Sequence, residues 1–235
     1  MINKKLGERM NKKEKLYPAL KRKKAIGIIV FCLIAFMLSG CFNITQHISK
    51  DGNDLNVFVK FAVSKSVFEM SSSMGGNKSD DNPCEGVFEF NENFIISEIP
   101  ENVEARFVKT DNDLECGYEM YMSVDVKSKD YKKLKRSNAP ALFPLVADGE
   151  IYIKFPKNDE NSSGGGDQMG AAFMSTALYR LTVNRNVIDE IDTVTFKTED
   201  ESYELTYIEL TDIFIIEVPL AYWITSSSEC ELIIK

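Results

Sequence analysis

Apolar and polar side chains alternate with a period of two along much of the chain, which is the pattern of β-strands with one buried face. Two runs show it best, at residues 55–63 and 114–126. In the second run the apolar positions on one face are Leu114, Cys116, Tyr118, Met120, Met122, Val124 and Val126. Shorter runs predict strands at residues 44–48, 87–90, 105–109, 142–146, 151–155, 179–183, 193–197, 203–210, 214–218 and 230–234. We therefore expect a fold dominated by antiparallel sheet.

Turn and helix signals separate these strands. Asp51-Gly52-Asn53-Asp54 and Asp148-Gly149 each lie between two predicted strands, so each predicts a hairpin. Short helices are predicted at residues 129–136, with Ser128 as N-cap, and at 167–178. Residues 71–83 and 157–166 are rich in Ser, Gly, Asn and Asp and predict surface loops. The predicted class is α+β: a single antiparallel-sheet-rich domain with one or two short helices.

The first 41 residues carry a different signal. Residues 21–24 are basic, residues 25–38 are uncharged, and the small-residue motif Leu38-Ser39-Gly40-Cys41 follows, which together form a secretory signal peptide. The motif resembles the lipobox of bacterial lipoproteins. That resemblance implies that residues 1–40 are removed and that Cys41 becomes the N-terminus, with diacylglycerol on its sulfur. It also implies an exported protein anchored in a membrane of the bacterial cell envelope, on its periplasmic or surface face.

The alternative for this segment is an uncleaved transmembrane helix. The 14 uncharged residues at 25–38 would span about 21 Å as a helix, whereas the hydrocarbon core of a bilayer is roughly 30 Å thick. The length therefore favours the lipoprotein signal, followed by a single lipid-anchored domain at residues 41–235.

Removal of the signal changes the charge of the protein. The whole chain has 28 basic and 36 acidic residues. Residues 1–40 hold 10 of the basic and 2 of the acidic ones, so the mature part has a net charge of −16. Such an acidic body is a poor partner for nucleic acid and is repelled by anionic headgroups.

The cysteines and the histidine give little support to a metal site. Cys84, Cys116 and Cys230 remain after Cys41 is lipidated; they allow at most one internal disulfide, and we expect them as buried, unpaired thiols. No two of them have the spacing of a metal-binding pair, and His47 has no partner histidine. We predict neither a metal nor a cofactor.

Signals for catalysis are also weak. Gly164-Gly165-Gly166 is not followed by the Lys-Ser/Thr of a phosphate-binding loop, and no serine stands in a G-x-S-x-G context. We therefore predict a protein that is not an enzyme.

Two clusters remain as candidate binding residues. Lys129, Lys132, Lys133 and Arg136 would share one face of the predicted helix. We expect this face either to be simply solvated or to contact anionic headgroups or an acidic partner. Tyr222 and Trp223 follow an apolar run that is interrupted by Pro219. They either belong to a core strand that runs into a turn or line a pocket or interface for acyl chains or a partner.

The layout of residues 42–156 resembles the LppM-like lipoprotein domain. The shared pattern is an early strand after Cys41, the Ile99-Pro100 break, a hairpin through Gly117, a short helix ending near Leu134 and a hairpin at Asp148-Gly149. The resemblance implies an α+β module associated with envelope lipids and glycolipids.

Together these features predict a non-catalytic, membrane-anchored envelope lipoprotein that binds an envelope lipid, a glycolipid or a protein partner. The alternative is a structural or interaction lipoprotein without a small-molecule ligand, and a hydrolase comes third.

Overall fold

The computed structural model describes residues 42–66, 84, 103–155, 157, 177–226 and 228–235. Residues 41–235 form one compact unit. The predicted signal peptide, the predicted strand at 87–90, the predicted loop at 71–83 and nearly all of the predicted loop at 157–166 lie outside the described residues. Most of the predicted helix at 167–178 does so too, but its last residue, Leu178, begins a strand.

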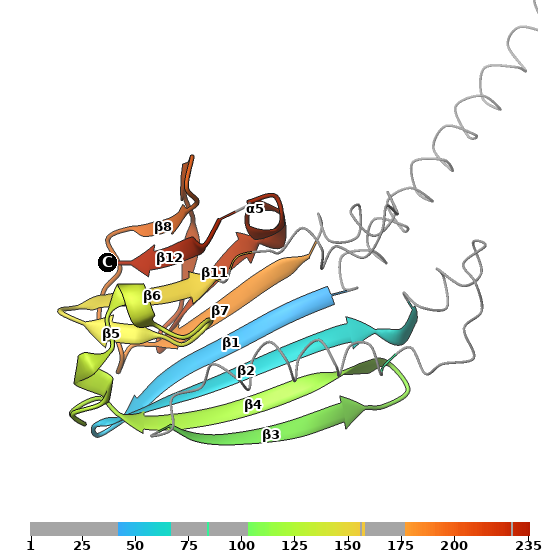
Figure 1. Cartoon of the computed structure of the whole chain (residues 1–235), viewed down its shortest axis with the longest axis horizontal. Coiled ribbons are helices and arrows are strands. Elements are labelled where there is room, and N and C mark those ends of the chain that lie inside the picture. The colour runs from blue at the N-terminus through green and yellow to red at the C-terminus, as the bar shows by residue number, and fades with distance from the viewer. Residues whose placement is uncertain (1–41, 67–83, 85–102, 156, 158–176, 227) are drawn as a thin grey trace, which may run out of the picture. The chain divides into compact units, whose positions relative to one another are not determined.

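The larger of two sheets has seven strands (Figure 1). Their spatial order is β10 (Tyr207–Glu209), β11 (Ile213–Pro219), β7 (Leu178–Asn184), β1 (Phe42–Asp51), β2 (Asp54–Ser64), β4 (Glu115–Asp125) and β3 (Glu104–Asp111). Neighbouring strands are antiparallel except β1 and β7, which run parallel. Because β1 begins at Phe42, almost no linker separates it from Cys41.

The smaller sheet has five strands, all antiparallel to their neighbours. Their order is β5 (Leu145–Ala147), β6 (Glu150–Phe155), β12 (Cys230–Ile234), β8 (Val194–Lys197) and β9 (Ser202–Glu204). The described residues thus form two predominantly antiparallel sheets with few helical turns, as the sequence predicts. No helix in this part of the chain has the length and hydropathy needed to cross a bilayer.

Both predicted hairpins are present. The β1–β2 hairpin turns through Gly52, whose φ of 60° is in the left-handed region that glycine adopts without strain. The β5–β6 hairpin turns through Asp148 and Gly149. Both residues have positive φ, which a two-residue turn needs in order to match the right-handed twist of the two strands. The β5 strand is shorter than predicted, beginning at Leu145 rather than at residue 142.

The core lies between the two sheets and is rich in aromatic rings. Phe155 of β6 makes edge-to-face contacts with Tyr179 of β7 at 5.0 Å and with Phe196 of β8 at 5.3 Å between ring centroids. Trp223 lies 5.9 Å from the same ring. The alternating positions of β1, β2, β4, β7 and β11 fill the remaining volume. In the runs at 55–63 and 114–126 the predicted apolar face is mainly the buried one, but Leu114 lies in the turn before β4 and is exposed, because the strand begins only at Glu115.

The strand predicted at residues 203–210 is two strands. β9 pairs within the smaller sheet and β10 within the larger one, so the chain crosses between the layers at residues 205–206. There the Leu205 amide donates to the carbonyl of Val194 at 2.8 Å. The alternation continues through this crossing because both strands bury one face in the same core.

The predicted helix at residues 129–136 is wrong. The segment forms two 3-10 turns, η2 (Tyr131–Lys133) and η3 (Arg136–Asn138), separated by extended backbone at Leu134. The Tyr131 side chain explains the break. It is buried, and its hydroxyl accepts a 2.8 Å hydrogen bond from the amide of Val146 next to the β5–β6 hairpin.

The predicted N-cap has a local counterpart. The hydroxyl oxygen of Ser128 accepts a 3.1 Å hydrogen bond from the amide of Tyr131, although the turn that follows is 3-10 rather than α-helical.

Two of the three cysteines are paired, which corrects the expectation of unpaired thiols. Cys84 forms a disulfide with Cys116 of β4, with the two Cα atoms 5.8 Å apart. Cys230 of β12 is a free, buried thiol, and burial raises its pKa. Sequence spacing does not reveal this pairing because it depends on where the chain around Cys84 lies in the fold.

Candidate functional site

The seven-stranded sheet has a second face, outside the core, and the strand register aligns a row of side chains across it. His47 of β1 lies opposite Phe58 of β2, and Phe58 lies opposite Tyr121 of β4. Tyr121 in turn lies opposite Arg106 of β3. Four adjacent strands therefore place an imidazole, two aromatic rings and a guanidinium side by side. We call these four residues the outer-face row.

Alternation along each strand explains why these side chains point away from the core. Val57 and Val59 are buried, so Phe58 between them lies on the opposite face. Met120 and Met122 likewise bury their side chains and leave Tyr121 44% exposed. The Phe58 and Tyr121 rings lie 4.9 Å apart at 47°, so together they form one apolar platform between His47 and Arg106.

A groove of about 420 Å³ lies over this row. Its other polar lining residues are Ser49, Asn56, Glu104 and Ser123. The Ser123 hydroxyl donates a 2.9 Å hydrogen bond to the side-chain oxygen of Asn56. The groove thus combines an aromatic floor with hydrogen-bonding groups, the composition typical of a small-molecule site, although it is open along the sheet.

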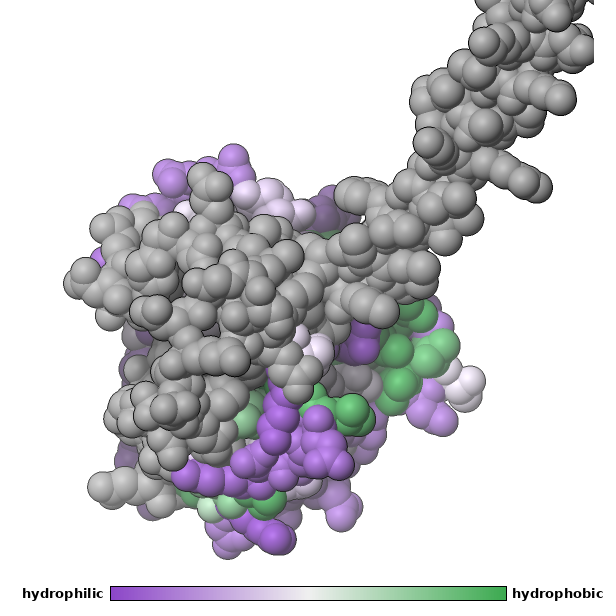
Figure 2. All heavy atoms as spheres, turned by 90° about the vertical axis from the view of Figure 1, so that its right-hand side faces the viewer, coloured by the Kyte–Doolittle hydropathy of each residue, from purple (hydrophilic) through white to green (hydrophobic). Residues whose placement is uncertain are grey.

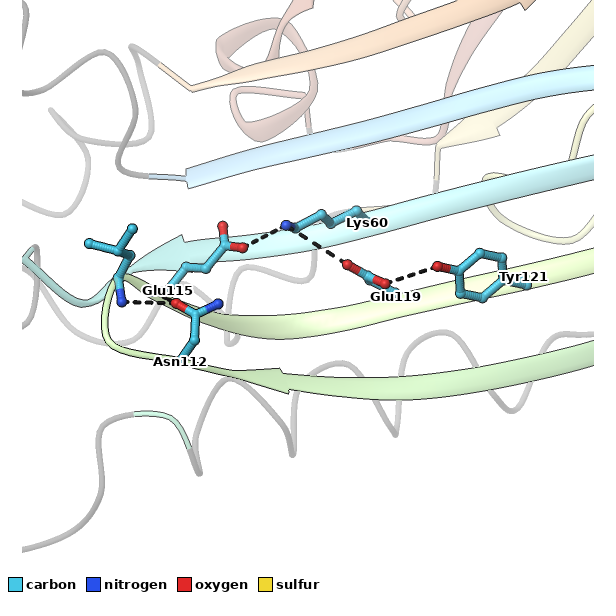
Figure 3. A network of polar contacts seen from close by, with 6 residues as sticks. Lys60, Asn112, Glu115, Glu119 and Tyr121 are labelled. Carbon is cyan, nitrogen blue, oxygen red and sulfur yellow. Dashed lines mark hydrogen bonds and ion pairs between the residues drawn. The ribbon is translucent and has the colours of Figure 1, made fainter.

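A network of polar contacts holds the Tyr121 ring from the side (Figure 3). The Tyr121 hydroxyl donates to Oε2 of Glu119 at 3.0 Å. Nζ of Lys60 lies 3.9 Å from Glu119 and 2.6 Å from Glu115. The hydrogen bond to the Glu119 carboxylate, followed by partial burial, raises the pKa of Tyr121. The phenol is therefore neutral at physiological pH and its position is fixed.

The two ends of the row differ in charge. Burial lowers the pKa of His47 below its ordinary value of 6.5, so the imidazole is neutral at pH 7. Arg106 is exposed and has no ion-pair partner among the described residues. A ligand would therefore find a neutral donor and acceptor at one end of the groove and a guanidinium with free donors at the other.

The groups of the outer-face row are suited to binding. His47 and Tyr121 are both neutral at pH 7, so each can donate or accept a hydrogen bond. In the described part of the chain, no three His, Cys, Asp or Glu side chains gather as metal ligands would. What the row offers is a flat ring surface flanked by hydrogen-bond donors and acceptors.

The basic residues singled out in the sequence lie elsewhere. Arg136 forms an ion pair with Glu150 at 2.6 Å and lies 5.1 Å from the centroid of the Tyr152 ring. Ion pairing to Lys235 and Arg136 lowers the pKa of Glu150. A second groove, of about 470 Å³, lies between these turns and the β5–β6 hairpin. Its basic lining residues are Lys132, Lys135 and Arg136.

The four predicted basic residues are only partly brought together. Lys132 and Arg136 line this groove, whereas Lys133 pairs with Asp130 at 2.8 Å and Lys129 is exposed outside it. Without a helix, they do not form the single face that the sequence predicts.

The position of this segment bears on what it contacts. It follows the end of β4, where Asp125 pairs with Asp54 beside the β1–β2 turn. Phe42 lies at the other end of β1, and ten strand residues span roughly 30 Å. The basic segment and the start of β1 are therefore at opposite ends of the sheet (Figure 1). The basic segment is therefore about the length of β1 away from the residue that follows Cys41.

Tyr222 and Trp223 belong to the short helix α5 (Leu220–Ile224), which follows directly after Pro219. Trp223 is only 8% exposed and packs on Phe155. Tyr222 stacks on Tyr203 at 4.0 Å with the rings nearly parallel. The structure thus places both rings in aromatic packing around the smaller sheet, as in the core interpretation, away from the outer-face row.

Sequence reasoning did not single out the outer-face row. A signal for part of it is present: Phe58 and Tyr121 are aromatic residues at the polar positions of two alternating runs. What the sequence lacks is the register that sets these rings side by side, with His47 and Arg106 beyond them.

Comparison with known proteins gives no relative. No family model, no curated protein and no solved structure matches the chain. The resemblances to bacterial lipoproteins and to LppM-like domains therefore remain predictions from the sequence.

Proposed function

We propose that this chain is an exported, lipid-anchored, non-catalytic protein of the bacterial cell envelope that binds a carbohydrate on the outer face of its larger sheet. The carbohydrate is the headgroup of an envelope glycolipid or an envelope glycan of the same chemistry. The observation that carries the proposal is the outer-face row of His47, Phe58, Tyr121 and Arg106 beneath a groove of about 420 Å³.

The chemistry of a sugar matches this groove. One face of a pyranose ring presents C–H groups, which an exposed aromatic ring such as Tyr121 can cover, while the ring edge presents hydroxyls. Asn56, Ser123 and His47 offer donors and acceptors to those hydroxyls at the groove wall. The open shape suits a headgroup or a chain that extends beyond the site.

Two features support export and anchoring. The Leu38-Ser39-Gly40-Cys41 motif predicts lipidation, and β1 begins at the next residue, Phe42. The Cys84–Cys116 disulfide fits a compartment that permits oxidation. Dual acylation anchors a protein stably where a single chain does not, so the domain would remain close to envelope glycolipids.

The test is a binding measurement with the lipid-anchored protein in nanodiscs. The probes are oligosaccharides released from the envelope of the bacterium that makes the protein, titrated by calorimetry. We expect Tyr121→Ala to weaken binding by about tenfold or more, because covering an aromatic side chain contributes roughly 1.5–3 kcal/mol and about 1.4 kcal/mol corresponds to a factor of ten. Arg106→Gln should weaken binding of acidic sugars more than that of neutral ones.

The matched control is Ile208→Ala. Ile208 is 57% exposed and lies on the same face of the same sheet, but on β10 rather than over the groove. It should leave binding unchanged. Equal affinity of the wild type, Tyr121→Ala and Ile208→Ala, or no binding at all, would reject the proposal.

A second candidate function is an interaction lipoprotein without a small-molecule ligand. The groove lined by Lys132, Lys135 and Arg136 favours it, since three basic residues outnumber the two acidic ones there, Asp148 and Glu150, in a domain that is acidic as a whole. The groove also lies at the end of the sheet away from the start of β1. An acidic protein partner that crosslinks at Lys132 while the envelope sugars fail to bind would favour this second function.

A further inference from the structure

The turn between β3 and β4 exposes a large apolar side chain. Leu114 is 78% exposed, more than the other large hydrophobic residues in the described part of the chain. A single exposed leucine is common on protein surfaces and needs no special explanation by itself. Its position relative to the proposed lipid anchor makes Leu114 a candidate for a contact with the membrane.

The strand register places Leu114 beside the start of β1. Phe42 pairs with Val63 of β2, and Val63 pairs with Cys116 of β4. Leu114 precedes Cys116 by two residues, and its carbonyl accepts a 2.9 Å hydrogen bond from the amide of Lys65 just beyond β2. It therefore lies about two strand spacings, roughly 10 Å, to the side of β1.

Along the strand direction Leu114 extends past Phe42. Leu114 lies two residues beyond the level of the Phe42–Val63–Cys116 pairs, at the end of the sheet where β1 begins. Figure 1 shows this turn and the start of β1 at the same end of the sheet. Seen from this end, the surface carries hydrophobic patches among hydrophilic side chains (Figure 2).

Local hydrogen bonds hold the turn in place. Oδ1 of Asn112 accepts hydrogen bonds from the amides of Leu114 at 2.9 Å and Glu115 at 3.1 Å (Figure 3). Lys65 pairs with Asp111 at 2.6 Å on the other side of the turn. Leu114 is thus presented by an ordered backbone, so little conformational entropy is lost when its side chain is immobilised.

The charges around the turn nearly cancel. Among the described residues the basic ones here are Lys60, Lys65 and Lys109, and the acidic ones are Asp111, Asp113, Glu115 and Glu119, the last of which lies opposite Lys60. The mature domain as a whole has a net charge of −16. Anionic headgroups repel this end less than they repel the rest of the surface, because the repulsion acts within a Debye length of roughly 10 Å.

We propose that Leu114 enters the interface of the bilayer that holds the Cys41 lipid and forms the second membrane contact of the domain. The proposal rests on the lipid anchoring proposed above. With two membrane contacts at the same end of the sheet, the strands are oriented roughly perpendicular to the membrane plane. The β1–β2 turn then lies at the end of the domain that faces away from the membrane. The outer-face row then runs roughly parallel to the membrane plane, five strand residues or roughly 16 Å beyond Phe42, where an extended headgroup or glycan reaches it.

The experiment uses the full chain, produced in a host that lipidates it, extracted from membranes and reconstituted in vesicles. Two variants are compared, Leu114→Trp and Asn53→Trp. Asn53 is exposed in the β1–β2 turn at the opposite end of the same sheet. The native Trp223 is buried and gives both variants the same background. Lipids brominated in their acyl chains quench only indoles that reach the interface.

The proposal expects brominated lipids to quench roughly half of the added emission in Leu114→Trp and essentially none in Asn53→Trp. Aqueous acrylamide should show the reverse order. If the intact mass shows the lipid on Cys41 but position 114 is quenched no more than position 53, the membrane contact is rejected and the anchor stands. If the mass shows no lipid, both proposals are overturned together.

Discussion

The hydroxyl of Tyr179 donates a 2.6 Å hydrogen bond to Oε1 of Gln46, and both side chains are fully buried. Nε2 of Gln46 in turn donates to the carbonyl of Leu142 at 3.0 Å. Gln46 is the buried polar side chain in the core of the described residues. It connects β1 and β7 of the larger sheet with the segment that leads into β5 of the smaller one. This network fixes how the two layers meet.

We expect Tyr179→Phe to destabilise the domain by about 1–3 kcal/mol. The variant keeps the ring that packs on Phe155 but leaves Oε1 of Gln46 buried without a donor, which costs its desolvation. Urea unfolding followed by circular dichroism measures the change. Tyr207→Phe is a suitable control, because its hydroxyl donates to the Ile191 carbonyl at a part-buried site. A loss no larger than that of the control would contradict the role of Gln46.

The position of Gln46 also shows what sequence patterns predict and where they fail. The sequence predicted a strand at residues 44–48, and in the structure Gln46 shares the buried face of that strand with Ile44 and Ile48. It gave no indication that β1 pairs in parallel with β7, more than 130 residues away. Local periodicity records which face is buried, whereas the choice of a distant neighbour depends on the packing of the whole chain.

The basic segment shows a different failure. Lysines at helical spacing predicted a helix, but the buried ring of Tyr131 holds the segment against the β5–β6 hairpin as two 3-10 turns. A tertiary contact here overrides a weak local propensity. In the outer-face row the local pattern was right but insufficient. Alternation indicates that Phe58 and Tyr121 point outward, whereas the strand register, which the sequence does not show, places the two rings side by side.

Gly117 is a position where no side chain fits. A Cβ atom there would lie 1.8 Å from the carbonyl oxygen of Phe61 on β2, a backbone atom that cannot move alone. We expect Gly117→Ala to destabilise the domain by about 2–3 kcal/mol through this clash. Gly52→Ala is the matched control: it has open space around it and only the strain of a positive φ, about 1–2 kcal/mol. Thermal unfolding should rank Gly117→Ala as the less stable variant, and the reverse order would contradict the close approach of β2 and β4.

The Cys84–Cys116 disulfide predicts a simple labelling pattern. With Cys41 blocked by its lipid, alkylation of the unfolded mature chain without reductant should modify Cys230 alone, and prior reduction should add two more labels, both read by intact mass. Cys84→Ala/Cys116→Ala should lower the free energy of unfolding by about 3 kcal/mol, because the bridge closes a loop across a separation of 32 residues. Cys230→Ala should leave the bridge intact. Three labels without reductant would show that the bridge is absent.

His47 is the sole histidine in the sequence, so its titration can be followed without assignment of other signals. Burial disfavours the charged imidazole and lowers the pKa of His47 in the folded protein below 6.5. Between that lowered pKa and 6.5 the unfolded chain binds more protons than the folded one. Folding stability is therefore full above pH 6.5 and declines as the pH falls through this window.

Proton NMR of the His47 ring should give a midpoint below the one measured in concentrated urea. His47→Gln should remove the decline in stability over the same window. A folded-state midpoint equal to or above the urea value would contradict the half-buried position of His47 in the outer-face row.

The last prediction concerns which way the basic segment faces. The register puts Lys132 at the far end of the sheet from Phe42, roughly 30 Å along β1, whereas Asp113 lies in the turn beside the start of β1. A donor dye on Lys132→Cys should therefore transfer less energy to acceptor-labelled headgroups than the same dye on Asp113→Cys, in the lipidated protein in vesicles. Both side chains are exposed, and Cys230 is buried, so labelling is selective.

Charge provides the control for this measurement. If the basic segment faces away from the membrane, Lys129→Glu/Lys132→Glu changes neither the transfer from position 113 nor its salt dependence. If electrostatic contact with anionic headgroups instead held the segment down, position 132 would show the stronger transfer at low salt and lose it near 1 M, where the Debye length is about 3 Å. That outcome would support a contact between the basic segment and anionic headgroups, and it would contradict the proposal that the segment binds an acidic partner.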